Sequence, residues 1–243
     1  MVEEILANKN AVYSLIKLRD YDNYTFTHSV NVCVLSILTG SLLGYNRMQL
    51  ENLGLGAMLH DIGKVLIDSR IMNKPAKLSV TEYEVVKKHT IFGYKLLKSK
   101  IATSFLPAHI ALQHHEREDG SGYPRGLTAK RIHRYAKIVA VADVFDAMTT
   151  DRIYQKAVIP QVSLEKIKKD QGIKFDKRIT ENFMRVIAPY PIGSILVLNN
   201  EQRVIVSQVT REKCIVKCIS GTNAGEKYDL FQRPELAVIK YFR

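Results

Sequence analysis

The sequence has few cysteines, no signal-peptide pattern in its first residues and no uninterrupted apolar run long enough to cross a bilayer. Its three cysteines, Cys33, Cys214 and Cys218, are too few and too scattered for a disulfide framework. The chain begins Met-Val-Glu-Glu, without the basic start and apolar core of a signal peptide. These absences predict a soluble, cytoplasmic protein with reduced thiols and no membrane span.

Acidic residues are outnumbered. The 243 residues include 36 Lys and Arg against 24 Asp and Glu, a formal net charge of +12 at pH 7. Such a surplus favours polyanionic partners, such as a nucleotide, a nucleic acid or an anionic membrane surface. On charge alone, an ordinary basic surface is the better explanation of this surplus. Net charge therefore does not establish a polyanionic partner.

Apolar spacing predicts that most of the chain is helical. An amphipathic helix is expected over residues 3–18 and a long, mostly buried helix over 24–43. A capping box, Ser79 to Glu82, opens a helix that we expect to reach His89. Further helices are predicted over residues 104–113, 131–150, 162–170 and 177–188.

Composition changes at residues 189–193, where two prolines and a glycine occur. Short β-type runs follow at 195–198, 204–209, 214–219 and 237–242, separated by turn residues. The expected fold class is therefore mainly α, with a helical domain over 1–188 and a small antiparallel β module over 189–243. We expect Cys214 and Cys218 to share one face of a strand as core residues. The module is expected to act as a cap, or as a partner-binding or dimer-forming surface.

The chemistry centres on residues 59–64, Leu-His-Asp-Ile-Gly-Lys. Leucines at helical spacing precede this segment, so we expect His60 and Asp61 near the C-terminal end of a packed helix. An imidazole and a carboxylate there can converge on one ion. Lys64 follows Asp61 by one turn, so it can reach an anion bound at the metal.

Other candidate ligands accumulate along the chain. Asp143 lies in an apolar helix, where a carboxylate is costly unless it is paired or bound to metal. Five imidazoles and two carboxylates exceed what one ion needs and suit two, with Asp61 as a plausible bridge. Such mixed ligands favour iron, manganese or zinc over a thiolate site. The full set is His28, His60, Asp61, His89, His114, His115 and Asp143.

These motifs, in this order and spacing, resemble the HD-GYP subgroup of the HD phosphohydrolase superfamily. The resemblance spans about residues 25–187. It includes the loop Asp-Gly-Ser-Gly-Tyr-Pro at 119–124 and the segment Asp-Val-Phe-Asp-Ala at 143–147. It implies an HD-type α-helical bundle, two divalent metal ions, usually iron or manganese, and cyclic di-GMP as the substrate.

The resemblance also implies residue roles. His28, His60, Asp61 and Asp143 would hold one metal, and His89, His114 and His115 the second, with Asp61 shared. Lys64 and Arg152 would bind phosphate oxygens, and Tyr123 would seat the substrate. Asp61 and Lys64 are the expected catalytic residues.

Three positions depart from the family pattern. Tyr24 stands where some members have a metal-binding Glu, so we predict two metals rather than three and pGpG as the main product. Gln155 replaces a common basic residue after Arg152, which Lys156 could offset. Milder changes are Lys137 for Arg and Lys177 for Pro.

The expected function is a metal-dependent phosphodiesterase that hydrolyses cyclic di-GMP to linear pGpG, or on to GMP, by a hydroxide that bridges the metals. One alternative is a catalytically weak cyclic di-GMP receptor. Another is a hydrolase of a different cyclic dinucleotide, such as cyclic GMP-AMP. A separate regulatory protein and a homodimer stay open as partners, whereas we do not expect nucleic acid as a partner.

Overall fold

The computed structural model describes residues 23–100, 105–150, 158, 160–187, 190, 192–210, 212–221 and 223–242. The predicted helix over 3–18, the side chain of Tyr24, and residues Arg152, Gln155 and Lys156 lie outside this part of the chain. Contacts divide the chain into two compact units. One comprises the described residues of 1–158 and 165–186, and the other those of 159–164 and 187–243.

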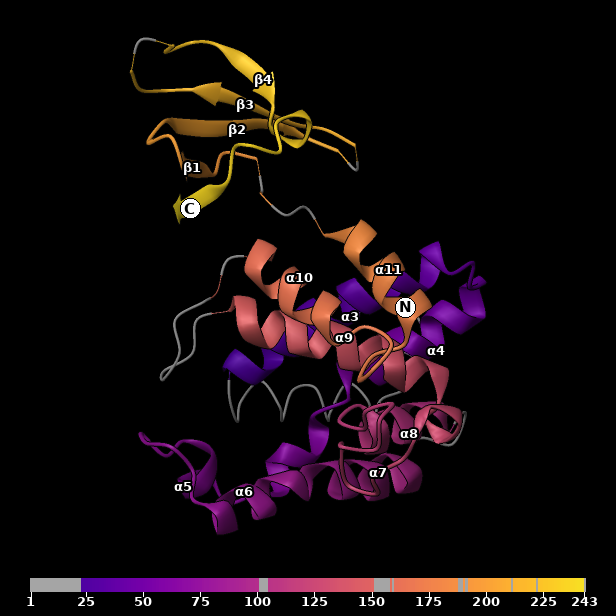
Figure 1. The fold of residues 1–243 in the computed structure, drawn as a ribbon. Helices are drawn as coiled ribbons and strands as arrows, with labels where there is room; N and C mark the ends of the chain where they lie inside the picture. Colours follow the sequence, from indigo (N-terminus) through magenta and orange to yellow (C-terminus); the bar gives the residue numbers. More distant parts are fainter. Residues whose placement is uncertain are drawn as a thin grey trace. The chain divides into compact units, whose positions relative to one another are not determined.

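The first unit is helical (Figure 1). Its elements, in chain order, are α3 (Asn23–Leu42), α4 (Arg47–Met58), the 3-10 helix η1 (Ile62–Leu66), α5 (Ser69–Met72), α6 (Val80–Lys87), α7 (His89–Lys100), α8 (Leu106–Gln113), the 3-10 helix η2 (Ala129–Arg131), α9 (Arg134–Thr149) and α11 (Lys177–Val186). Helix α10 (Pro160–Lys169) contributes its last residues, from Glu165 onward, to this unit.

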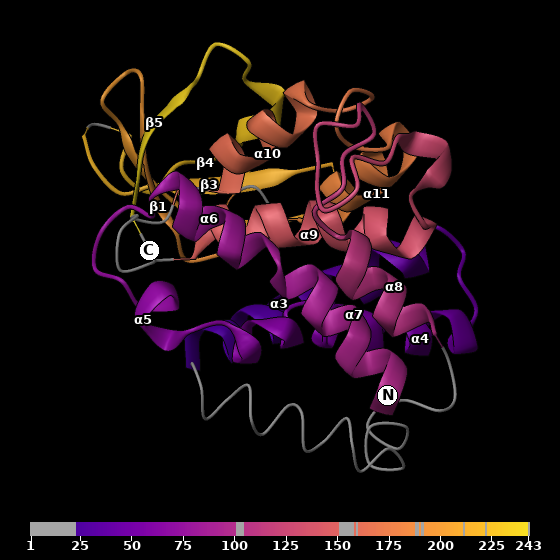
Figure 2. The same cartoon turned by 90° about the horizontal axis from the view of Figure 1, so that it is seen from below.

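Helix α9 is the central element of this unit. From Tyr135 to Phe145 it is buried almost all round, as its run of Ala, Val and Ile predicts. Helix α3 packs on α4, α9 and α11, while α8 packs on α4, α7 and α9. Helices α7 and α8 lie side by side in both views (Figures 1 and 2). Helix α3, which carries His28, and α8, which precedes His114, therefore both pack on α9, which carries Asp143.

Helix α3 is, among the described residues, the one helix long and apolar enough to cross a membrane by length and composition. Neighbouring helices cover one side of it, where the buried polar side chains His28, Ser29, Ser36 and Thr39 lie, while Val34 and Leu38 are exposed. A long apolar helix with covered polar groups is what the interior of a helical bundle requires.

Helix α4 ends at Met58, with Leu59 as its C-cap, so His60 and Asp61 directly follow its C-terminal end, where they were expected. The predicted continuation of one helix to His89 is wrong. Helix α6 ends at Lys87, and His89 begins a new helix, α7. Lys88 between them keeps helical backbone angles, φ −65° and ψ −14°, so side-chain periodicity carries no sign of the break. The predicted capping box of Ser79 and Glu82 is confirmed.

The second unit contains a five-stranded antiparallel sheet in the order β4-β3-β2-β1-β5. Its strands are β1 (Ile195–Leu198), β2 (Arg203–Val209), β3 (Cys214–Cys218), β4 (Lys227–Asp229) and β5 (Val238–Phe242), with the 3-10 helix η3 (Leu230–Gln232) after β4. Cys214 and Cys218 are both buried in its core, as predicted. The sequence did not predict β4. The fold class, a mainly helical HD fold with a small C-terminal antiparallel sheet, is confirmed.

Candidate metal centre

The seven predicted ligands come from five separate segments and meet in the helical unit. His28 lies on α3, His60 and Asp61 lie between α4 and η1, His89 starts α7, and Asp143 lies on α9. His114 and His115 follow the last residue of α8. All are buried except His115, which is half-buried. Folding therefore brings together every one of these residues.

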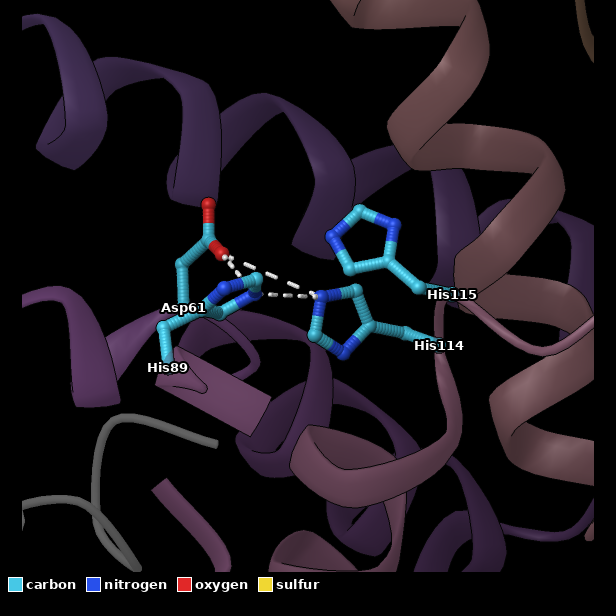
Figure 3. A group of neighbouring side chains, drawn as sticks. All are labelled: Asp61, His89, His114 and His115. Atoms are coloured by element: carbon cyan, nitrogen blue, oxygen red, sulfur yellow. Dashed lines mark hydrogen bonds and ion pairs between the residues drawn. The ribbon is translucent and has the colours of Figure 1, made fainter. Parts of the chain in front are cut away.

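They form two clusters, each with ligand atoms within 4.8 Å of one another. His28, His60 and Asp143 form the first cluster. The second consists of Asp61, His89, His114 and His115, which converge from three segments in Figure 3. Imidazole nitrogens and carboxylate oxygens are ligands that first-row divalent metals accept.

Asp61 connects the two clusters because its two oxygens face different ways. Oδ1 lies 3.3 Å from Nε2 of His89 and 3.8 Å from Nε2 of His114. Oδ2 lies 3.3 Å from Nε2 of His60 and 3.8 Å from Nε2 of His28. Ligand atoms about 2.0–2.2 Å from one tetrahedral ion lie about 3.3–3.6 Å apart. The geometry thus fits a binuclear site with one shared carboxylate.

Backbone carbonyls orient three of the histidines. Nδ1 of His60 donates to the carbonyl of Ala57, and Nδ1 of His89 donates to that of Val86, each at 2.7 Å. Nδ1 of His114 donates to the carbonyl of Ala111 at 2.9 Å. Each bond fixes the proton on Nδ1 and leaves Nε2 with its lone pair directed at the cluster. The turns that end the helices therefore prepare the ligands.

A carboxylate orients the fourth histidine. Nδ1 of His28 lies 2.6 Å from Oδ2 of Asp146, whose Oδ1 accepts a hydrogen bond from Asn31 at 2.8 Å. Asp146 lies on α9 one turn beyond Asp143 and is buried. A second carboxylate behind a metal-bound histidine raises its basicity as a ligand. Asp146 was not among the predicted site residues, although its spacing of three residues from Asp143 was a usable signal.

Electrostatics separate the two clusters. Burial lowers the pKa of His28, but hydrogen bonds to Asp143 and Asp146 and the nearby carboxylate charges outweigh it and raise that pKa to about 9. Burial instead dominates at His114, whose pKa falls to about 3, and it lowers the pKa of His89 and His115 as well. For Asp61, burial opposes ionisation, yet Lys64 and the surrounding histidines hold its pKa well below the usual range.

Two buried atoms support the fit of a metal. Among the described residues, Nε2 of His60 and Oδ1 of Asp61 have no hydrogen-bond partner. A buried polar atom without a partner costs about 1–3 kcal/mol, and a metal ion satisfies such atoms directly. The two atoms belong to different clusters, so both halves of the centre show the same need.

Glycines set the spacing of the segments that carry the ligands. A Cβ on Gly63 would lie 1.9 Å from the carbonyl oxygen of His89 and 2.5 Å from the amide nitrogen of Gly93. Backbone atoms cannot yield as a flexible side chain can. The absence of a side chain at Gly63 therefore lets η1 touch α7 and brings Asp61 beside His89.

The loop after His115 is held by similar means. A Cβ on Gly122 would lie 2.4 Å from the carbonyl oxygen of His115. The buried carboxylate of Glu116 accepts hydrogen bonds from the amides of Arg125 and Leu127, at 2.9 and 2.8 Å. Glu116 was not among the predicted site residues. Together these contacts lay the ring of Tyr123 on His115, with centroids 4.6 Å apart.

The predicted substrate-binding residues are placed in part. Nζ of Lys64 lies 2.5 Å from Oδ2 of Asp61 and is partly exposed, so it reaches the shared carboxylate from the solvent side. Tyr123 lies beside His115 at the rim of the second cluster. Arg152 lies outside the described residues.

A helical bundle with paired His/Asp clusters defines a class of metal-dependent protein, and comparison with known proteins agrees. The HD domain family model matches residues 2–179. A cyclic di-GMP phosphodiesterase of Pseudomonas aeruginosa is 36% identical over 81% of this chain and 47% of its own length. A 3′3′-cGAMP-specific phosphodiesterase of Vibrio cholerae is 31% identical over 74% of this chain and 35% of its own length.

A solved structure, an HDG"Y"P protein from Bdellovibrio bacteriovorus, has a TM-score of 0.56 and 26% identity, covering 67% of this chain and 52% of that one. The chain belongs to the HD domain family. The predicted resemblance to HD-GYP proteins is confirmed. The chain spans less than half the length of both relatives compared above.

Proposed function

We propose that this protein is a metal-dependent phosphodiesterase that opens cyclic di-GMP to the linear dinucleotide pGpG. The observation that carries the proposal is the position of Asp61, whose two oxygens face two separate His/Asp clusters. A paired metal centre of this kind suits hydrolysis of a phosphodiester. Iron and manganese are the proposed metals because the resemblance to HD-GYP proteins implies them, and the imidazole and carboxylate ligands suit both.

The chain's own residues supply orientation and charge. Divalent metals in the two clusters would add positive charge at the phosphate and make water a stronger acid. Asp61 connects the two clusters through its two oxygens. Lys64 lies at the shared carboxylate and is the side chain we assign to a nonbridging phosphate oxygen. Tyr123, packed on His115, forms the wall against which the nucleotide rests.

Cyclic di-GMP is favoured as the substrate by the relative from Pseudomonas aeruginosa and by the intact segment Gly122-Tyr123-Pro124. Tyr24 in place of a third-metal ligand supports pGpG as the end product. Cyclic GMP-AMP is the second candidate because the relative from Vibrio cholerae is named for 3′3′-cGAMP. A weakly active receptor is the third, since Gln155 removes a basic side chain.

The decisive test is product analysis. Protein purified without air and supplied with iron or manganese is incubated separately with cyclic di-GMP and 3′3′-cGAMP, and metal content is counted. Accumulation of pGpG with two metals per chain supports the proposal. Faster cleavage of 3′3′-cGAMP would favour the second candidate, and tight binding without product would favour the receptor.

A double variant, His60→Ala with Asp61→Ala, controls for contaminating hydrolases. It should lose both metal retention and turnover while keeping its helical content by circular dichroism. Turnover at the wild-type rate would contradict the assignment of the centre.

A cytoplasmic location, a separate regulator and a homodimer stay predictions.

A further inference from the structure

Two side chains on α6 stand beside the substrate wall without a role in the metal centre. Tyr83 and Lys87 are four residues apart and so share one face of the helix. The ring of Tyr83 meets that of Tyr123 edge to face, with centroids 6.5 Å apart and an interplanar angle of 77°. The aromatic series begun by His115 and Tyr123 thus extends outward onto α6.

The ammonium group of Lys87 lies beside both tyrosine rings. Its Nζ lies 5.4 Å from the ring centroid of Tyr83 and 5.5 Å from that of Tyr123, and it also pairs with Glu84 at 2.5 Å. A cation over aromatic rings is attracted to their faces. The ammonium is partly exposed, so it remains able to donate hydrogen bonds toward solvent.

The exposure of Tyr83 is the feature that needs an explanation. Tyr83 is 48% exposed, whereas Tyr123 is only partly exposed and its ring contacts those of His115 and Tyr83. A merely structural clamp between α6 and the loop would need no open ring surface. Nucleobases stack on such rings, and a lysine beside a stacked base can donate to O6 and N7 of guanine.

We propose that Tyr83 and Lys87 form a guanine-binding subsite beside the metal centre. One base of the cyclic dinucleotide stacks on the ring of Tyr83 while Lys87 donates to the acceptors on its edge. Adenine presents an amino group where guanine presents O6, so Lys87 selects guanine. The inference rests on the proposed function and adds the specificity that the metal centre cannot supply.

Tyr83 is tested with two substrates. Tyr83→Ala should raise KM for cyclic di-GMP about 5- to 150-fold, the range that corresponds to one lost base–aromatic stack. Hydrolysis of bis(p-nitrophenyl) phosphate, a diester without a purine, should stay within about twofold of wild type. Tyr83→Phe keeps the stacking ring, so its KM for cyclic di-GMP should stay close to that of wild type. A raised KM in this variant would show that the hydroxyl group, and not the ring, makes the contact.

Lys87 has a matched control on the next helix. Lys98 lies 5.7 Å from the ring centroid of Tyr94, also four residues earlier, and neither is among the metal-centre or loop residues described above. Lys87→Met should reduce the preference for cyclic di-GMP over cyclic di-AMP. This preference is measured as the ratio of the inhibition constant of cyclic di-AMP to the KM for cyclic di-GMP. Lys98→Met should leave that ratio unchanged.

The outcomes separate the two proposals. If wild type cleaves both diesters but Tyr83→Ala changes neither KM, the subsite is wrong and the phosphodiesterase stands. Equal losses on both diesters would show that Tyr83 supports the metal centre and would also overturn the subsite. If wild type cleaves neither diester, the proposed function fails and the subsite fails with it.

Discussion

The two units of this chain both have apolar cores, but they differ in the polar side chains that they bury. The helical unit buries ionisable groups next to one another, including Asp61 and Asp143 and most of the histidines. From residue 190 onward, the one buried polar side chain among the described residues is Ser194, and the core consists of Leu, Val, Cys and Tyr. Burying a charge is costly unless a partner compensates it, whereas burying an apolar chain is favourable.

This difference shows where function opposes stability. Neighbouring imidazoles whose pKa values are lowered by burial do not pack for stability alone, because apolar side chains of similar size would cost less. The sheet carries no such cost. Changes in the helical unit should therefore act first on metal and turnover, and changes in the sheet on the free energy of unfolding.

The largest effect is expected from Asp61→Asn. The amide removes the negative charge that both clusters share, so we expect turnover to fall by at least about a thousandfold, or about 4 kcal/mol. Metal content, measured by plasma emission, should drop below two per chain. Asp68→Asn, at an exposed helix cap, is the control and should keep both metals. Full metal content in the Asp61 variant would remove the basis for a shared carboxylate.

Gly63→Ala tests the backbone contact that brings the clusters together. The added carbon collides with the carbonyl of His89, so we expect a loss of about 3 kcal/mol or more in unfolding free energy and loss of metal. Gly93→Ala is the matched change in α7, because its Cβ would lie no closer than 3.3 Å to any neighbour. Urea titration and metal analysis of both proteins check this. Equal effects at the two positions would contradict the account.

Leu196→Ala should destabilise the sheet without altering the metal centre. Leu196 is fully buried in the sheet core, and removing such a side chain costs about 2–5 kcal/mol. Ile239→Ala, at a position 57% exposed in the same sheet, should cost far less. Denaturant titration measures the cost, while metal content should stay at two. A loss of metal in the Leu196 variant would show that the two units are not independent.

The smallest predicted effect concerns pH. In metal-free protein the pKa of His28 is about 9 when folded, against 6.5 as its ordinary value. The stability that this provides, at most about 3 kcal/mol, is therefore fully present below pH 6.5 and lost as pH rises toward 9. His28→Asn should remove this dependence. Urea titrations of both metal-free proteins at pH 6.5 and 9 measure this dependence. An equal change in unfolding free energy between the two pH values in both proteins would contradict the prediction.

The sequence allowed the seven candidate ligands, which the structure brings together, to be grouped in advance, because histidines and buried carboxylates are rare enough for their positions to carry information. It placed β1 through its run of apolar residues and α6 through its capping box. It missed the start of α7 because Lys88 keeps a helical backbone. It also missed β4, whose three residues are too short for alternation to register.

The residues that orient the ligands were harder to predict. Asp146 and Glu116 act on groups that are 118 and 9 to 11 residues away in sequence. Their roles depend on which segments meet, so the spacing of Asp146 from Asp143 was the one local signal for either residue. Carboxylates of this kind look like ordinary surface charges until the fold buries them.

The contact at Gly63 has a consequence for how such a protein can change over evolution. Here two lengths of main chain, rather than the ligands themselves, set the distance between the segments that carry Asp61 and His89. A histidine or carboxylate can therefore be exchanged in either cluster, altering metal preference or reactivity, while the spacing is inherited unchanged. Because Gly63 has no Cβ, the main-chain spacing is fixed at this contact, whereas the ligand side chains on either side are free to vary.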